Sequence, residues 1–154
     1  MRFMMLMIPR VYQGEEGRQA GAAYAPSAEM VERMMEYNEG LAKAGALIAL
    51  DGLRSPVNGA RVSFSKGKTS VTDGPFTESK EVLGGYWMID VESREEAVAW
   101  ARRCPAEDGD VVEVRQVFET PDFPPEARRA AENPVVSGQI AKTAGAVRPG
   151  GEST

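Results

Sequence analysis

VLGGYWMIDVESREEAVAWARRC, residues 82–104, places the pattern of a strand directly before the pattern of a helix. Alternation over Val82–Val91 predicts a strand with apolar side chains on both faces, Leu83, Trp87, Ile89 and Val91 on one and Tyr86 and Met88 on the other. Ser93 and Glu96 have the spacing of a capping box that begins a helix, and Pro105 ends it. The helix is expected to bury Ala97, Trp100, Ala101 and Cys104. This stretch therefore predicts half of a βαβ unit.

The N-terminal part of the chain repeats this order of strand and helix. Phe3–Ile8 is apolar at every position and predicts a strand that is covered on both faces. A helix is expected from its cap at Ser27 to near Gly45, with an apolar stripe at Met30, Met34, Tyr37 and Leu41. We interpret its methionines, including Met35, as core residues and not as a soft-metal or flexible binding surface. The long connection Pro9–Pro26 is a candidate lid or binding loop, with a surface excursion as the alternative.

The remaining segments complete an α+β fold. Leu47–Leu50 predicts a short strand, and Arg61–Ser65 and Lys68–Thr72 predict a hairpin that turns at Gly67. Val111–Phe118 predicts the last strand. The resulting order is strand, helix, strand, hairpin, strand, helix, strand, which is a ferredoxin-like split βαβ arrangement with an inserted hairpin.

The C-terminal part of the chain differs in composition. We expect one domain over residues 1–119, followed by a C-terminal segment over residues 120–154. Within that segment, Asp122–Glu132 predicts a short helix that begins with two prolines. Residues 133–154 are rich in Gly, Ala and Pro and are interpreted as an arm or a disordered tail.

The two strands that are apolar on both faces predict a homodimer. Helices in a split βαβ fold cover only one face of the sheet, so Phe3–Ile8 and Val82–Val91 leave apolar side chains on the other face. At about 25 cal/mol per Å², leaving such a face in water would cost several kcal/mol. A second copy packed sheet against sheet is the simplest cover.

The composition excludes several classes of function. The net charge of -5 opposes binding to nucleic acid or anionic membranes. With no histidine and one cysteine, the chain lacks the residues for a zinc site or a Ser–His or Cys–His catalytic pair. No phosphate loop or dinucleotide fingerprint is present, so neither a cofactor nor a metal is expected. One cysteine and no signal peptide or membrane-spanning run predict a cytoplasmic protein.

The most distinctive segment is Val71–Tyr86, which contains the tetrad Asp73-Gly74-Pro75-Phe76 and the pair Gly84-Gly85. Pro75 disfavours the helical region for Gly74, and the Asp73 carboxylate is placed to accept turn N–H groups. Two glycines in a strand indicate a bulge or the close approach of a ligand or another backbone.

The string D-G-P-F-x-E-x-K-E-x-L-G-G resembles the DGPF branch of the YCII-related family, and the likeness extends over residues 1–119. The resemblance implies a dimeric α/β barrel of ferredoxin-like type. Members of the wider family carry a proposed His–Asp pair, and relatives eliminate chloride from chlorinated rings. Since this chain has no histidine, that pair cannot be carried over.

The candidate site residues come mostly from the tetrad and the segments beside it. For catalysis, Asp73 is the expected general base, with Glu78 and Glu81 beside it. For binding a small polar or anionic ligand, the candidates are Arg54, Arg61, Phe76, Lys80 and Tyr86. The competing interpretation is structural: Asp73 serves as a turn carboxylate, and the charged residues form solvated ion pairs.

Two functions follow from these residues. The first is a small-molecule-binding domain that acts as an isomerase or lyase on a small polar metabolite. The alternative is a non-catalytic ligand-binding or regulatory interaction module, because no complete catalytic set is present.

Overall fold

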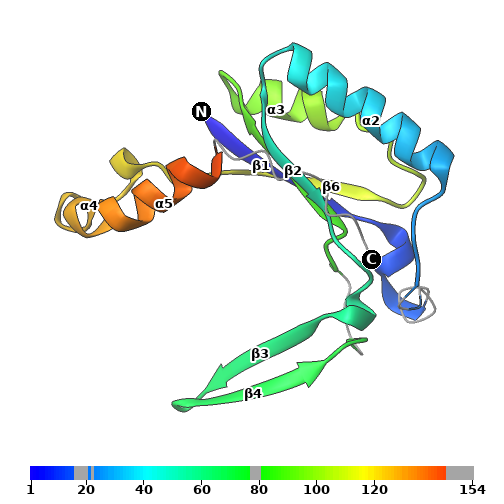
Figure 1. Ribbon diagram of the computed structural model, residues 1–154, viewed down its shortest axis with the longest axis horizontal. Helices are drawn as coiled ribbons and strands as arrows, with labels where there is room; N and C mark the ends of the chain where they lie inside the picture. The colour runs from blue at the N-terminus through cyan, green and yellow to red at the C-terminus, as the bar shows by residue number, and fades with distance from the viewer. Residues whose placement is uncertain (16–20, 22, 77–80, 145–154) are drawn as a thin grey trace. The chain divides into compact units, whose positions relative to one another are not determined.

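The computed structural model describes residues 1–15, 21, 23–76 and 81–144, and the chain divides into two units, Met1–Val117 and Phe118–Thr154 (Figure 1). The centre of the first unit is a four-stranded antiparallel sheet in the order β2-β5-β1-β6. Its strands are β1 (Arg2–Ile8), β2 (Leu47–Gly52), β5 (Gly85–Asp90) and β6 (Val111–Gln116).

Two βαβ units interleave in this sheet. Helix α2 (Ala28–Lys43) connects β1 to β2, and helix α3 (Arg94–Ala101) connects β5 to β6. Strand β5 lies between the two strands of the first unit, and β1 lies between the two strands of the second. This is the split βαβ order expected from the sequence, and the α+β class is confirmed.

Both helices cover the same face of the sheet (Figure 1). The buried strand residues Phe3, Met5, Met7, Trp87 and Ile89 alternate along β1 and β5 and pack with Tyr37, Leu41, Ala97 and Trp100 from the helices. Buried polar groups in this layer have partners: the Trp87 indole donates to Asn38 Oδ1 at 2.8 Å, and the Tyr37 hydroxyl donates to the Trp100 carbonyl at 2.9 Å. Burial also raises the pKa of Tyr37, which keeps the phenol neutral.

The helix boundaries follow local sequence signals. Ser27 Oγ accepts from the Met30 N–H at 3.2 Å, and Ser93 Oγ accepts from the Glu96 N–H at 3.1 Å. The Glu96 carboxylate accepts from the N–H of Glu92 at 2.9 Å, one residue before the position in a standard capping box. Both predicted helix starts are therefore confirmed.

A second sheet consists only of the hairpin β3 (Ala60–Ser65) and β4 (Lys68–Asp73), the inserted hairpin predicted from the sequence. The turn residues Lys66 and Gly67 have φ values of 49° and 74°, the backbone that a tight two-residue hairpin turn requires. Every residue of both strands is exposed.

The two ends of the hairpin come together beside the short helix η2 (Pro56–Asn58). The N–H of Gly74 donates to the Gly59 carbonyl at 2.9 Å. A Cβ atom at Gly74 would lie 1.9 Å from the Pro56 carbonyl oxygen, so only glycine fits this crossing of two backbones.

One expectation for the first unit needs correction. The strand predicted over Val82–Val91 begins at Gly85, because the N–H of Val82 donates to the side chain of Gln13 at 3.0 Å and not to a neighbouring strand. In the described residues of the single chain the sheet is open, with β2 and β6 at its edges, and the barrel formed by two copies stays a prediction.

The second unit contains η3 (Thr120–Asp122), α4 (Pro125–Ala131) and α5 (Pro134–Ala144). Helix α4 agrees with the predicted short helix. Helix α5 lies over residues 134–144 of the segment that was predicted as an arm or a disordered tail, and residues 145–154 of that segment lie outside the described residues. Asn133 Oδ1 caps the helix by accepting from the N–H groups of Val135 and Val136 at 3.0 and 3.2 Å. Asn133 before Pro134 at the first helical position is the local sequence signal for this helix start. Among the described helices of the chain, none has the length and apolarity to cross a bilayer.

Candidate functional site

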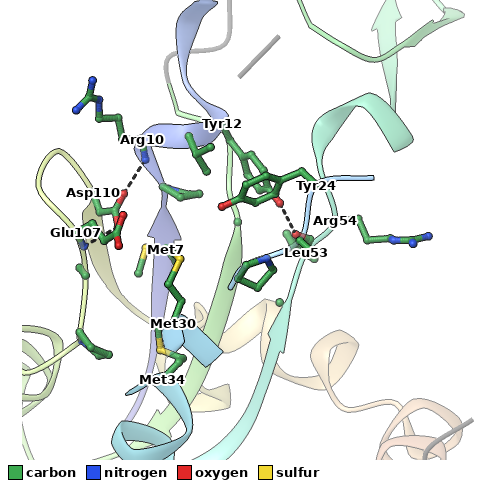
Figure 2. Close-up of a pocket in the computed structure, with 18 of the residues that line it drawn as sticks. Met7, Arg10, Tyr12, Tyr24, Met30, Met34, Leu53, Arg54, Glu107 and Asp110 are labelled. Carbon is green, nitrogen blue, oxygen red and sulfur yellow. Dashed lines mark hydrogen bonds between the residues drawn. The ribbon is translucent and has the colours of Figure 1, made fainter. Parts of the chain in front are cut away.

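A cavity of about 700 Å³ lies in the first unit, at the end of β1 and the start of α2 (Figure 2). Its wall comes from elements that are distant in the sequence. The loop after β1 contributes η1 (Arg10–Tyr12) and residues 23–26, and the segment before β6 contributes residues 105–108 and Asp110. Met30 and Met34 of α2, residues 52–54 at the end of β2, and Met7, Pro9 and Gly84 complete it. Described residues at both ends of the loop predicted as a candidate binding loop therefore line this cavity.

The inner wall is rich in thioethers. Figure 2 shows the side chains of Met7, Met30 and Met34 lying next to one another in the cavity. Methionine is unbranched and polarizable, so such a wall adapts to an apolar or aromatic surface. The sequence interpretation of these helix methionines as core residues was incomplete: Met34 packs against the core, Met30 and Met34 both line the cavity, and Met35 is exposed.

Two tyrosines form another part of the wall. The Tyr12 hydroxyl donates to the Leu53 carbonyl at 3.2 Å, which ties the loop after β1 to the end of β2. The rings of Tyr12 and Tyr24 pack edge to face with centroids 5.7 Å apart. Burial raises the pKa of Tyr12, with Tyr24 adding to the effect, so the phenol stays neutral.

Charged residues lie around this apolar wall, and one of them organises it. Asp110 Oδ1 accepts from the backbone N–H of Arg10 at 2.8 Å, and its Oδ2 accepts from the N–H of Glu107 at 2.9 Å. The carboxylate thus holds two lining segments together, which is a structural role. In Figure 2 the side chains of Arg10 and Arg54 extend away from the methionines on opposite sides.

Gln13 ties the cavity loop to the segment that follows the tetrad. Its Nε2 donates to the carbonyls of Pro9 and Val82 at 2.8 and 2.9 Å, and its Oε1 accepts from the Val82 N–H. At Gly84 and Gly85, which follow Val82, other parts of the chain come very close to the backbone. A Cβ at Gly84 would lie 2.5 Å from the ring of Pro9, and one at Gly85 would lie 2.9 Å from the Asp51 carbonyl oxygen. The interpretation of these glycines as a point of close approach is confirmed.

The YCII-related domain matches residues 1–121, most of the chain. This chain belongs to the YCII-related domain family. It is also similar to "Uncharacterized protein R00369" of Rhizobium meliloti (strain 1021), with 42% identity over 60 residues. These residues are 39% of this chain and 48% of the relative, so the likeness spans about half of the relative's length.

The sequence-predicted site residues occupy three places in the YCII-related domain. Arg54 lines the cavity. At the base of the hairpin, the Arg61 guanidinium lies 4.0 Å from the centre of the Phe76 ring, and Asp73 is exposed at the end of β4. On the sheet face opposite the helices, the Tyr86 hydroxyl donates to Asp51 Oδ2 at 2.7 Å, and this bond raises the pKa of Tyr86.

Three further candidates lie near the tetrad in the sequence. Glu81 is exposed, and Glu78 and Lys80 lie outside the described residues. Asp73 and Glu81 are not among the residues that line the cavity. Among the described residues, no three Asp, Glu or Cys side chains are grouped as a metal site would need.

Tyr12, Gln13 and Tyr24 were not predicted individually as site residues. They lie in a loop without periodicity, so no helix or strand pattern singled them out. The length of that loop was the only signal that pointed to them.

Proposed function

We propose that this chain is a small-molecule-binding YCII-related domain of the DGPF branch, with its ligand in the cavity beside Tyr12 and Met30. The observation that carries the proposal is the cavity itself, about 700 Å³ in volume and walled by thioethers and tyrosine rings. Binding sites for small molecules have this size and this mainly apolar lining with few polar groups.

The lining also favours one kind of ligand. An aromatic or apolar body fits between the methionines and the two tyrosine rings. A polar group on the same ligand would lie at the margin of the cavity, where Arg10, Arg54, Glu107 and Asp108 belong to the lining. The proposed ligand is therefore an amphipathic molecule with an apolar body and a small polar end.

Binding is favoured over catalysis by the position of Asp73. Its side chain is exposed in the single copy, and it does not line the cavity. An isomerase or lyase with Asp73 as its base would need a second surface to enclose that carboxylate. The non-catalytic module is thus the function that the geometry supports best.

The binding proposal is tested with an aromatic anionic probe, anilinonaphthalenesulfonate, titrated into the protein and followed by fluorescence. Met30→Glu places a carboxylate in the cavity wall and should weaken binding by about tenfold or more. Met35→Glu is the matched control, because Met35 lies on the same helix but is 57% exposed. Equal affinities of the two variants, or no binding by the wild-type protein, would contradict the proposal.

We also propose that the domain is a homodimer that closes into an α/β barrel through its open sheet face. The half-buried side chains Met4, Leu6, Tyr86 and Met88 alternate with the core residues and meet across β1 and β5. Exposed charges of Asp51, Asp90, Glu113 and Arg115 lie around them. An apolar centre with a charged rim is typical of a protein interface.

Sedimentation equilibrium tests this second proposal. Leu6→Glu places a charge in the centre of the open face and should shift the wild-type dimer to a monomer. A wild-type protein that stays monomeric at high micromolar concentration would overturn it.

A further inference from the structure

Among the described residues that line the cavity, the uncharged polar side chains are those of Tyr12 and Tyr24. The Tyr12 hydroxyl donates to the Leu53 carbonyl, just as the Tyr37 and Tyr86 hydroxyls donate to acceptors elsewhere in the domain. The described part of the chain gives the Tyr24 hydroxyl no hydrogen-bond partner. Of the four tyrosines, Tyr24 therefore keeps its hydroxyl available for another molecule.

Contacts within the cavity wall fix the position of the Tyr24 ring. The N–H of Tyr24 donates to the Gly21 carbonyl at 3.0 Å, and the ring packs edge to face against Tyr12, which is itself tied to the end of β2. In Figure 2 the Tyr12 hydroxyl turns toward Leu53, whereas the Tyr24 hydroxyl extends to the side of the cavity where Met7 lies. A ligand in the cavity would thus meet a hydroxyl group that is already in place beside the apolar wall.

The rest of the wall offers few uncharged hydrogen-bond donors. Three lining residues have no backbone N–H because they are prolines: Pro9, Pro26 and Pro105. The N–H groups of Leu53 and Gly84 donate to the carbonyls of Gly84 and Met7 at 2.9 and 2.8 Å. The hydroxyl of Tyr24 is therefore well placed to orient the polar end of a ligand.

The charges of the lining favour a neutral polar group on the ligand. Arg10 and Arg54 lie in the lining with three acidic residues, Glu107, Asp108 and Asp110, which gives a net charge of -1. The two arginine side chains also extend away from the methionines (Figure 2). No excess of positive charge is thus present to select an anion. A phenol hydroxyl donates well to a neutral acceptor, such as a carbonyl oxygen.

We infer that the Tyr24 hydroxyl donates a hydrogen bond to a neutral acceptor on the ligand, a ketone or amide carbonyl, while the apolar body of the ligand lies against Met7, Met30 and Met34. This inference rests on the proposed function, and it names the residue that orients the ligand and the chemical group that this residue selects.

Two uncharged probes with the same aromatic body test this hydrogen bond. A dimethylaminonaphthalene with a propionyl group is fluorescent and carries a ketone acceptor, and the same molecule with a propyl group in its place has no acceptor there. Tyr24→Phe removes the hydroxyl and keeps the ring. It should weaken binding of the ketone probe by about three- to tenfold and leave the affinity for the propyl probe within about twofold of the wild type.

The emission of the bound ketone probe gives a second measurement. A hydrogen bond donated to the ketone shifts the emission to longer wavelengths, so the emission should lie at shorter wavelengths in the Tyr24→Phe variant. An unchanged emission with the same affinity ratio for the two probes would overturn the inference and leave the cavity as a binding site. No binding of either probe by the wild type would overturn the cavity proposal and the inference together.

Tyr12→Phe is the matched control, because it removes the hydroxyl of the neighbouring ring, which is already bonded to the Leu53 carbonyl. This variant should change the affinities for the two probes by the same factor. A loss confined to the ketone probe in the Tyr12 variant would assign the donor to Tyr12 and contradict the inference.

Thermal unfolding separates a ligand contact from a structural role. Since the Tyr24 hydroxyl has no partner among the described residues, Tyr24→Phe should keep the wild-type Tm. Tyr12→Phe should lower it, because the bond between the loop and the end of β2 is lost. A lower Tm in the Tyr24 variant would show that its hydroxyl is used within the chain and would overturn the inference.

Discussion

The four-stranded sheet and the β3–β4 hairpin use similar strand residues but differ completely in burial. Met5 and Ile89 in the sheet are fully buried, whereas Val62 and Phe64 in the hairpin are more than half exposed. The sheet is covered by two helices of its own chain, and the hairpin is not. Alternating apolar residues thus predict that a strand has one apolar face. They do not identify the element that covers that face.

The largest expected difference is in the free energy of unfolding when one phenylalanine from each region is replaced. Phe3→Ala removes a side chain that is 1% exposed and should lower the free energy of unfolding by about 3–5 kcal/mol. Phe64→Ala should lower it by less than about 1 kcal/mol when measured in urea at submicromolar protein, where single copies dominate. Comparable losses at the two positions would show that the hairpin is packed within one copy.

The next largest difference is expected in the alkylation rates of two thiols, one in each region. Burial raises the pKa of the Cys104 thiol to about 11, and the negative charge of Asp110 adds to the shift. At about pH 8 its thiolate fraction should be roughly a hundredfold smaller than that of an exposed thiol. Alkylation by iodoacetamide, followed by mass spectrometry, should therefore be slow at Cys104 and should accelerate as the pH rises toward 11.

The control for this prediction is a thiol on the hairpin. Ser63→Cys in a Cys104→Ser background places it on an exposed strand, where alkylation should proceed at the rate of an unfolded peptide. Similar rates for the two cysteines would mean that the segment after α3 opens readily.

The smallest expected difference is in the free energy of unfolding when one of two serines is replaced. Ser93→Ala removes the acceptor for the Glu96 N–H at the start of α3 and should lower the free energy of unfolding by about 1 kcal/mol. Ser65→Ala at the end of β3 should change it by less than about 0.5 kcal/mol. Thermal unfolding measures both, and an unchanged transition in the Ser93 variant would contradict the capping role.

Much of the fold was predictable because its signals are local. The starts of α2 and α3 depend on a serine and the backbone N–H three residues later. The hairpin turn depends on the backbone of Lys66 and Gly67. Each signal lies within a few residues, so the sequence alone reveals it. Helix α5 had the same kind of signal in Asn133 and Pro134, and the Gly- and Ala-rich composition around it concealed that signal.

The candidate site was less predictable because its parts meet only in three dimensions. Tyr12 contacts Leu53, and Asp110 holds Arg10, across 41 and 100 residues of sequence. The start of β5 shows the same limit: its residues have the strand pattern from Val82 onward, but Gln13 binds Val82 in place of a neighbouring strand. Distant partners of this kind leave no periodicity in the sequence.

Gly74 gives the tetrad Asp73-Gly74-Pro75-Phe76 a structural role in this chain. The Pro56 carbonyl oxygen occupies the space that a β-carbon would take, so the tetrad records a point where two chain segments cross. A side chain at position 74 would therefore separate the two segments that meet at the base of the hairpin.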